Sequence, residues 1–374
     1  MAPELGRQGA GGPEGGGGGQ GAADREDPAD AEDVFQCPAG AAEARALALT
    51  CDLCQHRMQT VADLLLLTSD PRPVRTASLS VFGESVGRCR ETVASRARGL
   101  AVLLRDLAAL ALREPLAAGA RELRVCVEEI CDLVVSLTEC CAHAGYLLAV
   151  LQEGSSPEVP GPVDRYQLCR AAAEVEHKTG LLRTYSLHSV TALQLTDICI
   201  SVTESANILN DSCLKAADEA QEDNVREQFR LCLKNITATV NTFCGSVKFL
   251  KDKPTDLNYR ACQVFGEALT TSCNALAVFA TQDPQLMGSG AILGYAGRET
   301  LNSVLSACMG VVSPCVLVCS VVRELALKTG CSTGSGHVRD DKAVVRVQQC
   351  QAAVLRSSVK LAHVLGNGGP QDQR

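Results

Sequence analysis

The chain has 374 residues, of which 46% are hydrophobic but only 3% are aromatic, and none is Trp. Its formal net charge is −8, and residues 1–40 carry −6 of this, so the rest of the chain is close to neutral. Because nucleic-acid binding depends on a dominant positive field, this balance argues against a general nucleic-acid-binding protein.

Residues 1–40 are of low complexity, with an unbroken glycine run from Gly15 to Gly19 followed by a stretch rich in Asp, Glu and Ala. Such a segment buries too little apolar surface to offset its ordering entropy, so we expect a disordered tail, and a second one over 367–374. The tail contains no apolar stretch typical of a secretory signal. We therefore expect a cytoplasmic protein whose 20 cysteines are reduced.

Three long helices are predicted between residues 41 and 153. Apolar residues recur at steps of three or four from Leu47 to Leu65, from Val86 to Leu107 and from Leu123 to Leu148. This is the spacing of one helix face. Prolines 71 and 73 end the first helix, because proline cannot continue a helix.

Six further helices follow, separated by two breaks rich in Pro and Gly, at 154–162 and 282–290. Eight of the twelve Phe and Tyr residues lie between the breaks, whereas the flanking helices share faces of Ala, Val, Leu and Cys. We therefore predict an all-α fold of nine helices. A five-helix bundle of residues 41–153 and 288–366 would carry an inserted four-helix bundle of residues 163–281. The alternative is two or three bundles strung end to end.

The helix ranges expected after the first break are about 163–184, 188–219, 222–251, 256–281, 291–329 and 339–365. Within the fifth of these, residues 300–322 carry no charge and are numerous enough to span a bilayer. Asn302, Ser303 and Pro314 interrupt the stretch, and no aromatic belt flanks it. We predict the most buried helix of a bundle, without insertion into a membrane, and leave open whether it is buried on every side; a membrane span is the alternative.

No set of residues suggests catalysis. Cys51 and Cys54 form a CxxC pair, but no second pair stands at zinc-site spacing, and both cysteines fall on the apolar face of their helix. The six histidines are scattered, and no phosphate-binding loop or nucleophile motif occurs. We expect a non-enzymatic protein without a metal or cofactor.

The last predicted helix carries a mostly basic row at alternating steps of four and three, made of Lys342, Arg346, Gln349, Ala353, Arg356, Lys360 and His363. A row of cations on a nearly neutral body suits a repetitive acidic partner such as an actin filament. The alternative is a solvated face whose cations are favoured by the helix dipole. The candidate actin-binding residues are Lys342, Arg346, Arg356, Lys360 and His363.

The helix expected at 256–281 has an apolar face wider than the three positions in seven that a bundle helix needs. The surplus suggests a second contact, either with another copy of the chain or with a partner helix. The alternative is tighter burial at the junction between the bundles. The candidate dimer-interface residues are Leu257, Ala261, Val264, Phe265 and Ala268.

Four stretches carry a resemblance to a known family: CDLCQHRMQTVADLLLL (51–67), CDLVVSLTECCAHAGYLLAV (131–150), GPVDRYQLCR (161–170) and REQFRLCLK (226–234). In these the chain resembles relatives of the talin rod, and similarity continues at lower density to about residue 365. The resemblance implies the fold of the seventh and eighth talin rod modules, in which a four-helix bundle is inserted between the third and fourth helices of a five-helix bundle.

The resemblance also implies F-actin binding and bundling, homodimerisation through the four-helix part, and a place in the cytoskeleton of filopodia. A second hypothesis is a non-enzymatic adaptor whose bundles capture amphipathic helices of adhesion or signalling proteins without contacting actin.

Overall fold

The computed structural model describes residues 39–75, 85–111, 116–331 and 341–367, and most of them are helical. The prediction of an all-α fold is confirmed. The two segments predicted to be disordered lie outside the described residues, except for Ala39, Gly40 and Asn367, which belong to helices.

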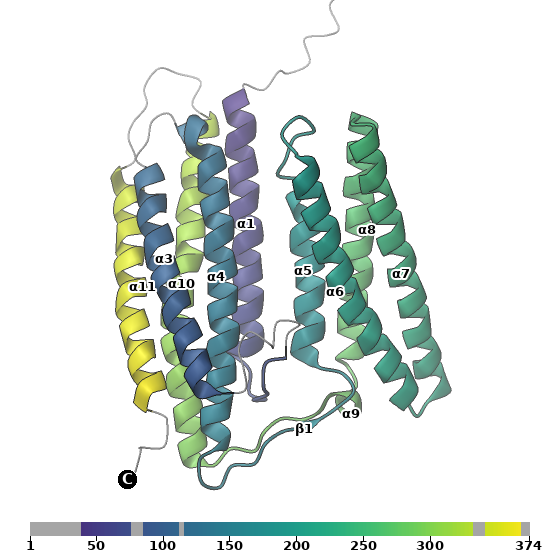
Figure 1. Cartoon of the computed structure of the whole chain (residues 1–374), viewed down its shortest axis with the longest axis vertical. Helices are drawn as coiled ribbons and strands as arrows, with labels where there is room; N and C mark the ends of the chain where they lie inside the picture. Colours follow the sequence, from purple (N-terminus) through teal and green to yellow (C-terminus); the bar gives the residue numbers. More distant parts are fainter. Residues whose placement is uncertain (1–38, 76–84, 112–115, 332–340, 368–374) are drawn as a thin grey trace, which may run out of the picture. The chain divides into compact units, whose positions relative to one another are not determined.

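Five helices pack around one hydrophobic cluster (Figure 1). Helix α10 contacts α1, α4 and α11, while α3 contacts α4 and α11. The buried side chains are those with alternating spacing in the sequence, such as Leu47, Cys54 and Val61 of α1. These helices are α1 (Ala39–Leu65), α3 (Val86–Ala111), α4 (Leu116–Val150), α10 (Tyr295–Cys331) and α11 (Asp341–Asn367).

Four helices pack around a second hydrophobic cluster, and each contacts its neighbours in chain order, with α8 also contacting α5. Thr191 and Gln194 form a reciprocal capping box at the start of α6, and Thr255 accepts a hydrogen bond from the Asn258 amide at the start of α8. These helices are α5 (Arg165–Leu181), α6 (Ala192–Glu219), α7 (Asp223–Asp252) and α8 (Asp256–Ala280).

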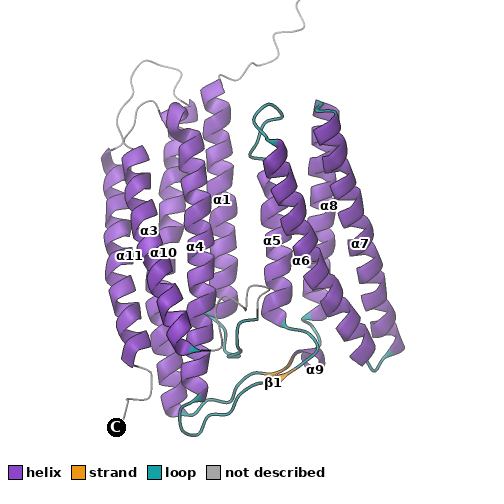
Figure 2. Cartoon of the chain, viewed as in Figure 1, coloured by secondary structure: helices purple, strands orange, loops and turns teal. Residues whose placement is uncertain are grey.

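The two breaks predicted from the sequence are not plain linkers, because they pair with each other. Strand β1 (Val159–Pro160) runs antiparallel to β2 (Gly288–Ser289), the orange segment of Figure 2. Ser156 and Ile292 exchange two further backbone hydrogen bonds of 2.8 and 3.1 Å. A four-residue helix, α9 (Pro284–Met287), precedes β2 and raises the helices of the described residues to ten, against the nine predicted.

Helix α10 is not fully buried, a point that the sequence left open. Asn302, Ser303, Ser306 and Ser313 lie on an exposed face, because uncharged polar residues recur on one side of the helix. By length and composition, two helices of the described residues could cross a membrane, within 119–150 and 295–328. Of their most apolar windows, 78% and 56% are buried within the folded chain.

Helices α1 and α5 approach closely because α5 has a glycine, Gly180, in its last turn. A Cβ atom at Gly180 would lie 2.8 Å from the Leu53 side chain of α1. Leu53 therefore packs against the second cluster although α1 belongs to the first. This contact brings together the charged residues described below.

Candidate functional site

Helix α8 presents a continuous apolar row to solvent, which we call the α8 apolar stripe: Leu257, Ala261, Val264, Ala268, Ala275 and Val278. Its members follow one another at steps of three or four, apart from one step of seven, so they lie on one face of the helix. Leu257 is 77% exposed and Val264 is 60% exposed. Ala261 is half-buried, and Phe265 lies beside the stripe at 36% exposure.

The α8 apolar stripe borders helix α7. Ser272 of α8 accepts a hydrogen bond of 3.1 Å from the Asn235 side chain of α7, and the rings of Phe229 and Phe279 meet at 4.9 Å. Phe265 is one heptad before Ser272, so it lies on the side of α8 that borders α7. The exposed Leu231 and Phe249 of α7 add to the apolar surface.

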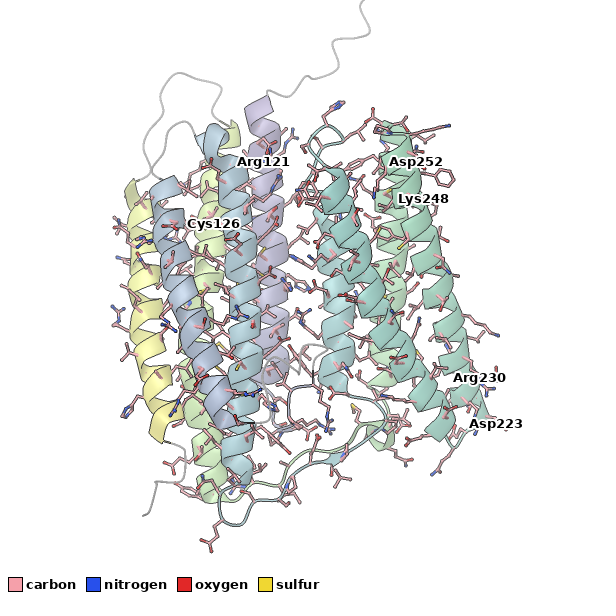
Figure 3. All side chains as sticks on the ribbon, viewed as in Figure 1. Arg121, Cys126, Asp223, Arg230, Lys248 and Asp252 are labelled. Atoms are coloured by element: carbon pink, nitrogen blue, oxygen red, sulfur yellow. The ribbon has the colours of Figure 1, made fainter. Side chains whose placement is uncertain are left out.

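Charged side chains mark both ends of α7. Asp223 and Arg230 are exposed near its start, and Lys248 and Asp252 near its end (Figure 3). Between them the exposed and half-exposed face is mostly small or apolar, with Ala238, Thr242 and Gly245 in succession. The five residues predicted for a dimer interface are thus together on α8, and all but Ala261 are exposed.

The predicted actin-binding residues lie along α11. Lys342, Arg356, Lys360 and His363 are exposed, whereas the Arg346 guanidinium donates a 2.8 Å hydrogen bond to Glu324 of α10. Arg346 therefore has a local partner, which its place in the sequence did not reveal. We call Lys342, Arg346, Arg356, Lys360 and His363 the α11 cationic row.

The α11 cationic row follows the junction with α10. Lys360 lines a surface hollow of about 510 Å³ with Tyr295 and Arg298. Arg346 lines another of about 360 Å³, whose wall includes Pro314 and Leu317 of α10. Pro314 has no backbone N–H, so the helical hydrogen bond to Gly310 is absent at this point.

Exposed apolar side chains on α11 escaped the sequence prediction. Val345, Leu355 and Val359 are exposed, and Val359 reaches 72%. They are one position away from cations of the row, so the outward surface of α11 combines apolar and positive groups. Their helical spacing beside the cations is visible in the sequence, so this signal could have identified them.

A buried ion-pair network joins α1, α4 and α5, and it also escaped prediction. Arg57 of α1 bonds to Glu174 of α5 at 2.9 Å and to Asp132 of α4. Glu174 also accepts from Arg170 at 2.6 Å. The chain of contacts ends at Glu139 of α4, which accepts from Arg170 at 3.1 Å and from the hydroxyl of Tyr166 at 2.7 Å.

Burial and charge act in opposite directions on this network. Burial opposes ionisation of Glu174, but Arg57 and Arg170 outweigh it and lower the pKa of this carboxyl to about 2. Burial and the nearby Arg57 charge lower the pKa of His177 to about 3, so this imidazole is neutral at pH 7. Its Nδ1 atom is buried without a hydrogen-bond partner.

The CxxC pair lies in the interior of the first cluster. Cys51 and Cys54 are both fully buried, and burial, together with the nearby Asp52, raises the pKa of Cys51 to about 12. A thiol of this kind remains protonated and acts as a small apolar side chain. Among the described residues, no group of three or more His, Cys, Asp or Glu side chains is placed to hold a metal ion.

Comparison with known protein families found no family model that matches the chain. The interpretation of the two surfaces therefore depends on their own chemistry and on the talin-rod resemblance of the sequence.

Proposed function

We propose that the chain is a non-enzymatic, homodimeric protein that crosslinks actin filaments in the cytoskeleton of cell projections such as filopodia. The observation that carries this proposal is the α8 apolar stripe. Large apolar side chains such as Leu257 and Val264 are exposed at the spacing of a helix-packing face. Burying them against water is favourable, and a second copy offers the same face in a twofold arrangement.

The α11 cationic row supplies the proposed filament contact. It belongs to a different group of helices from α8, so dimerisation through α8 leaves the row accessible on both copies. Bundling requires two filament sites per particle, and a dimer provides them. A filament with a repeated acidic surface would attract Lys342, Arg356 and Lys360, with an affinity that falls as salt rises.

The dimer is tested with Phe265→Asp, which places a carboxylate next to the α8 apolar stripe. We expect a folded monomer by light scattering that still pellets with F-actin at high speed but no longer forms low-speed bundles. Leu193→Asp is the matched control, because Leu193 is 79% exposed on α6 and does not belong to the α8 apolar stripe. A dimer that persists in Phe265→Asp, or is lost equally in Leu193→Asp, would refute this assignment.

The filament contact is tested by reversing Lys342, Arg356 and Lys360 to Glu in one variant. We expect weaker co-sedimentation and a flatter dependence on salt. The control reverses three exposed cations on other helices, Arg121, Lys215 and Lys248, and so changes the net charge equally. Equal weakening in both variants would indicate a general charge effect and not a site on α11.

The adaptor hypothesis makes the opposite prediction. The exposed apolar side chains of α7 and α8 have the chemical character that receives an amphipathic helix. A protein that captures partner helices without touching actin pellets with filaments at neither low nor high speed. Failure of the wild-type chain at both speeds would therefore replace the crosslinking proposal with the adaptor.

A further inference from the structure

Thiols from different helices meet in four places among the described residues. The pairs are Cys54 with Cys131, Cys89 with Cys140, Cys141 with Cys308, and Cys199 with Cys244. In the first three pairs both side chains are fully buried, so solutes cannot reach the sulfur atoms. Cys199 and Cys244 are only half-buried. This pair combines contact between two sulfurs with access from solvent.

The pair bridges the antiparallel helices α6 and α7 at nearly equal distances along the chain from the turn that joins them. The Cys244 sulfur of α7 lies 3.8 Å from the hydroxyl of Thr203 on α6, and Cys199, one helical turn before Thr203, is close enough to interact with Cys244. Neighbouring contacts keep the helices in register. Lys251 donates to Thr196 at 2.9 Å on one side, and Asn210 donates to Thr237 at 3.4 Å on the other.

The surroundings favour a thiolate on Cys244. The hydrogen bond from Cys199 lowers the pKa of Cys244 to about 6, against the effect of burial and with help from the Thr203 hydroxyl at 3.8 Å. The same contact raises the pKa of Cys199, which stays protonated. A reactive sulfur thus lies next to a second thiol able to resolve an oxidised intermediate.

We propose that Cys199 and Cys244 form a peroxide-sensitive modification site that closes to a disulfide between α6 and α7. The Cys244 thiolate attacks hydrogen peroxide, the O–O bond breaks, and the products are a Cys244 sulfenic acid and hydroxide, which takes a proton to become water. The Cys199 sulfur then attacks the Cys244 sulfur, the S–O bond breaks, and a second water leaves with the Cys199 proton. Two thiols are oxidised and one peroxide is reduced.

The test treats the purified full-length protein with one equivalent of hydrogen peroxide, followed by alkylation, trypsin digestion and mass spectrometry. The expected product joins peptides 184–215 and 235–248 and is lighter by about two hydrogens than their sum. Because the first peptide also contains Cys213, fragmentation must place the bond on Cys199. A bond to Cys213, or oxidation elsewhere at the same dose, overturns the proposal.

Two variants define the roles of the sulfurs. Cys199→Ser removes the resolving thiol, so Cys244 sulfenic acid should accumulate and be trapped by dimedone. Cys169→Ser is the matched control, since Cys169 is equally half-buried but has Arg165 and Asp164 as its charged neighbours. Unchanged crosslinking is expected in the control. The absence of a dimedone adduct on Cys244 in Cys199→Ser would contradict the proposal.

The consequence for the fold is measured by thermal unfolding. The oxidised wild type should melt at a higher temperature than the reduced protein, because the crosslink restrains the unfolded chain. Dithiothreitol should reverse the shift, and Cys199→Ser should show none. A shift of equal size in peroxide-treated Cys199→Ser would assign the effect to other sulfurs.

Discussion

The guanidinium of Arg57 on α1 bonds to the carboxylate of Glu174 on α5 at 2.9 Å, with exposed fractions of only 7% and 12% for the two side chains. The residues are far apart in the sequence and belong to helices of the two hydrophobic clusters. An ion pair this buried is costly to separate, because each charge left alone would remain desolvated. The pair therefore helps to fix α5 against α1.

Breaking this pair should destabilise the protein strongly. Arg57→Met leaves Glu174 with Arg170 as its remaining basic partner, and we expect a loss of about 3 kcal/mol in the free energy of unfolding. Urea denaturation measures it. Arg183→Met is the control, since its 3.6 Å contact with Glu267 is half-exposed and should be worth less than about 1 kcal/mol. Equal losses in the two variants would show that the buried pair has no special weight.

Removing both charges should cost less than the two single changes predict. In Arg57→Met/Glu174→Leu no buried charge of this pair is left without its partner, so the double variant should recover part of the stability lost by the single variants. A double-mutant cycle measured by urea denaturation gives the coupling energy. If the losses of the two single variants add up to the loss of the double variant, the coupling energy is zero and the ion pair itself adds no stability.

The protein should lose stability as the pH falls below about 6.5. The pKa of His177 is lowered from 6.5 to about 3, and that of Glu174 from 4.5 to about 2. Both groups therefore bind protons more readily in the unfolded state. The His177 contribution is lost between pH 6.5 and 3, and the Glu174 contribution between pH 4.5 and 2.

Urea midpoints measured from pH 7 to pH 4 test this dependence. His177→Gln should flatten the upper part of the curve, between pH 6.5 and 4.5, whatever its effect at pH 7. His188→Gln, on an exposed residue, serves as the control and should leave the slope unchanged. An unaltered slope in His177→Gln would contradict the assignment.

The paired strands depend on glycine at position 288. Its φ of 65° is in the left-handed region, and a Cβ atom would lie 2.2 Å from the carbonyl oxygen of Val159. Gly288→Ala should therefore lower the free energy of unfolding by more than about 1 kcal/mol, which thermal unfolding measures. Gly245→Ala is the opposite control. A Cβ atom added at Gly245, which belongs to α7, would meet no other atom within 4 Å. This change should therefore raise the free energy of unfolding by about 0.5–1 kcal/mol.

Thiol labelling should divide the cysteines by burial. Of the 18 cysteines whose side chains the structure describes, only Cys169, Cys199, Cys232 and Cys244 are partly exposed. In a variant with Cys37 and Cys331 changed to Ser, we expect at most four rapidly reacting thiols in the native protein, and all 18 after unfolding. Burial raises the pKa of Cys273 to about 12, which further suppresses its reaction. Rapid labelling of Cys273 would contradict the burial pattern.

The helices could be predicted because each one has its own apolar spacing within a single stretch of sequence. Helix α7 spans Asp223–Asp252 where the apolar spacing predicted 222–251, and α8 ends one residue before its predicted limit. The surplus face of α8 was likewise a property of one helix, so Leu257 and Val264 could be named in advance. Both inferences need only the geometry of a single helix.

Features that join distant segments could not be predicted in this way. Val159 pairs with Ser289 through the backbone, and two-residue strands leave no pattern of alternation to detect. The contacts of Arg57 with Glu174 and of Cys199 with Cys244 depend on how separate helices dock. The exposed face of α10 could not be assigned for another reason: Asn302 and Ser303 are polar without charge, and such residues occur both in cores and on surfaces.

The pairing of β1 with β2 brings residues 160 and 288 side by side, so the intervening segment leaves the first group of helices and returns to it at nearly one point. A segment with adjoining ends can be gained, deleted or exchanged during evolution with little disturbance to its host. Helices α5 to α8 thus have the geometry of an inserted segment that can be exchanged between proteins. A short turn in their place would reconnect α4 to α10.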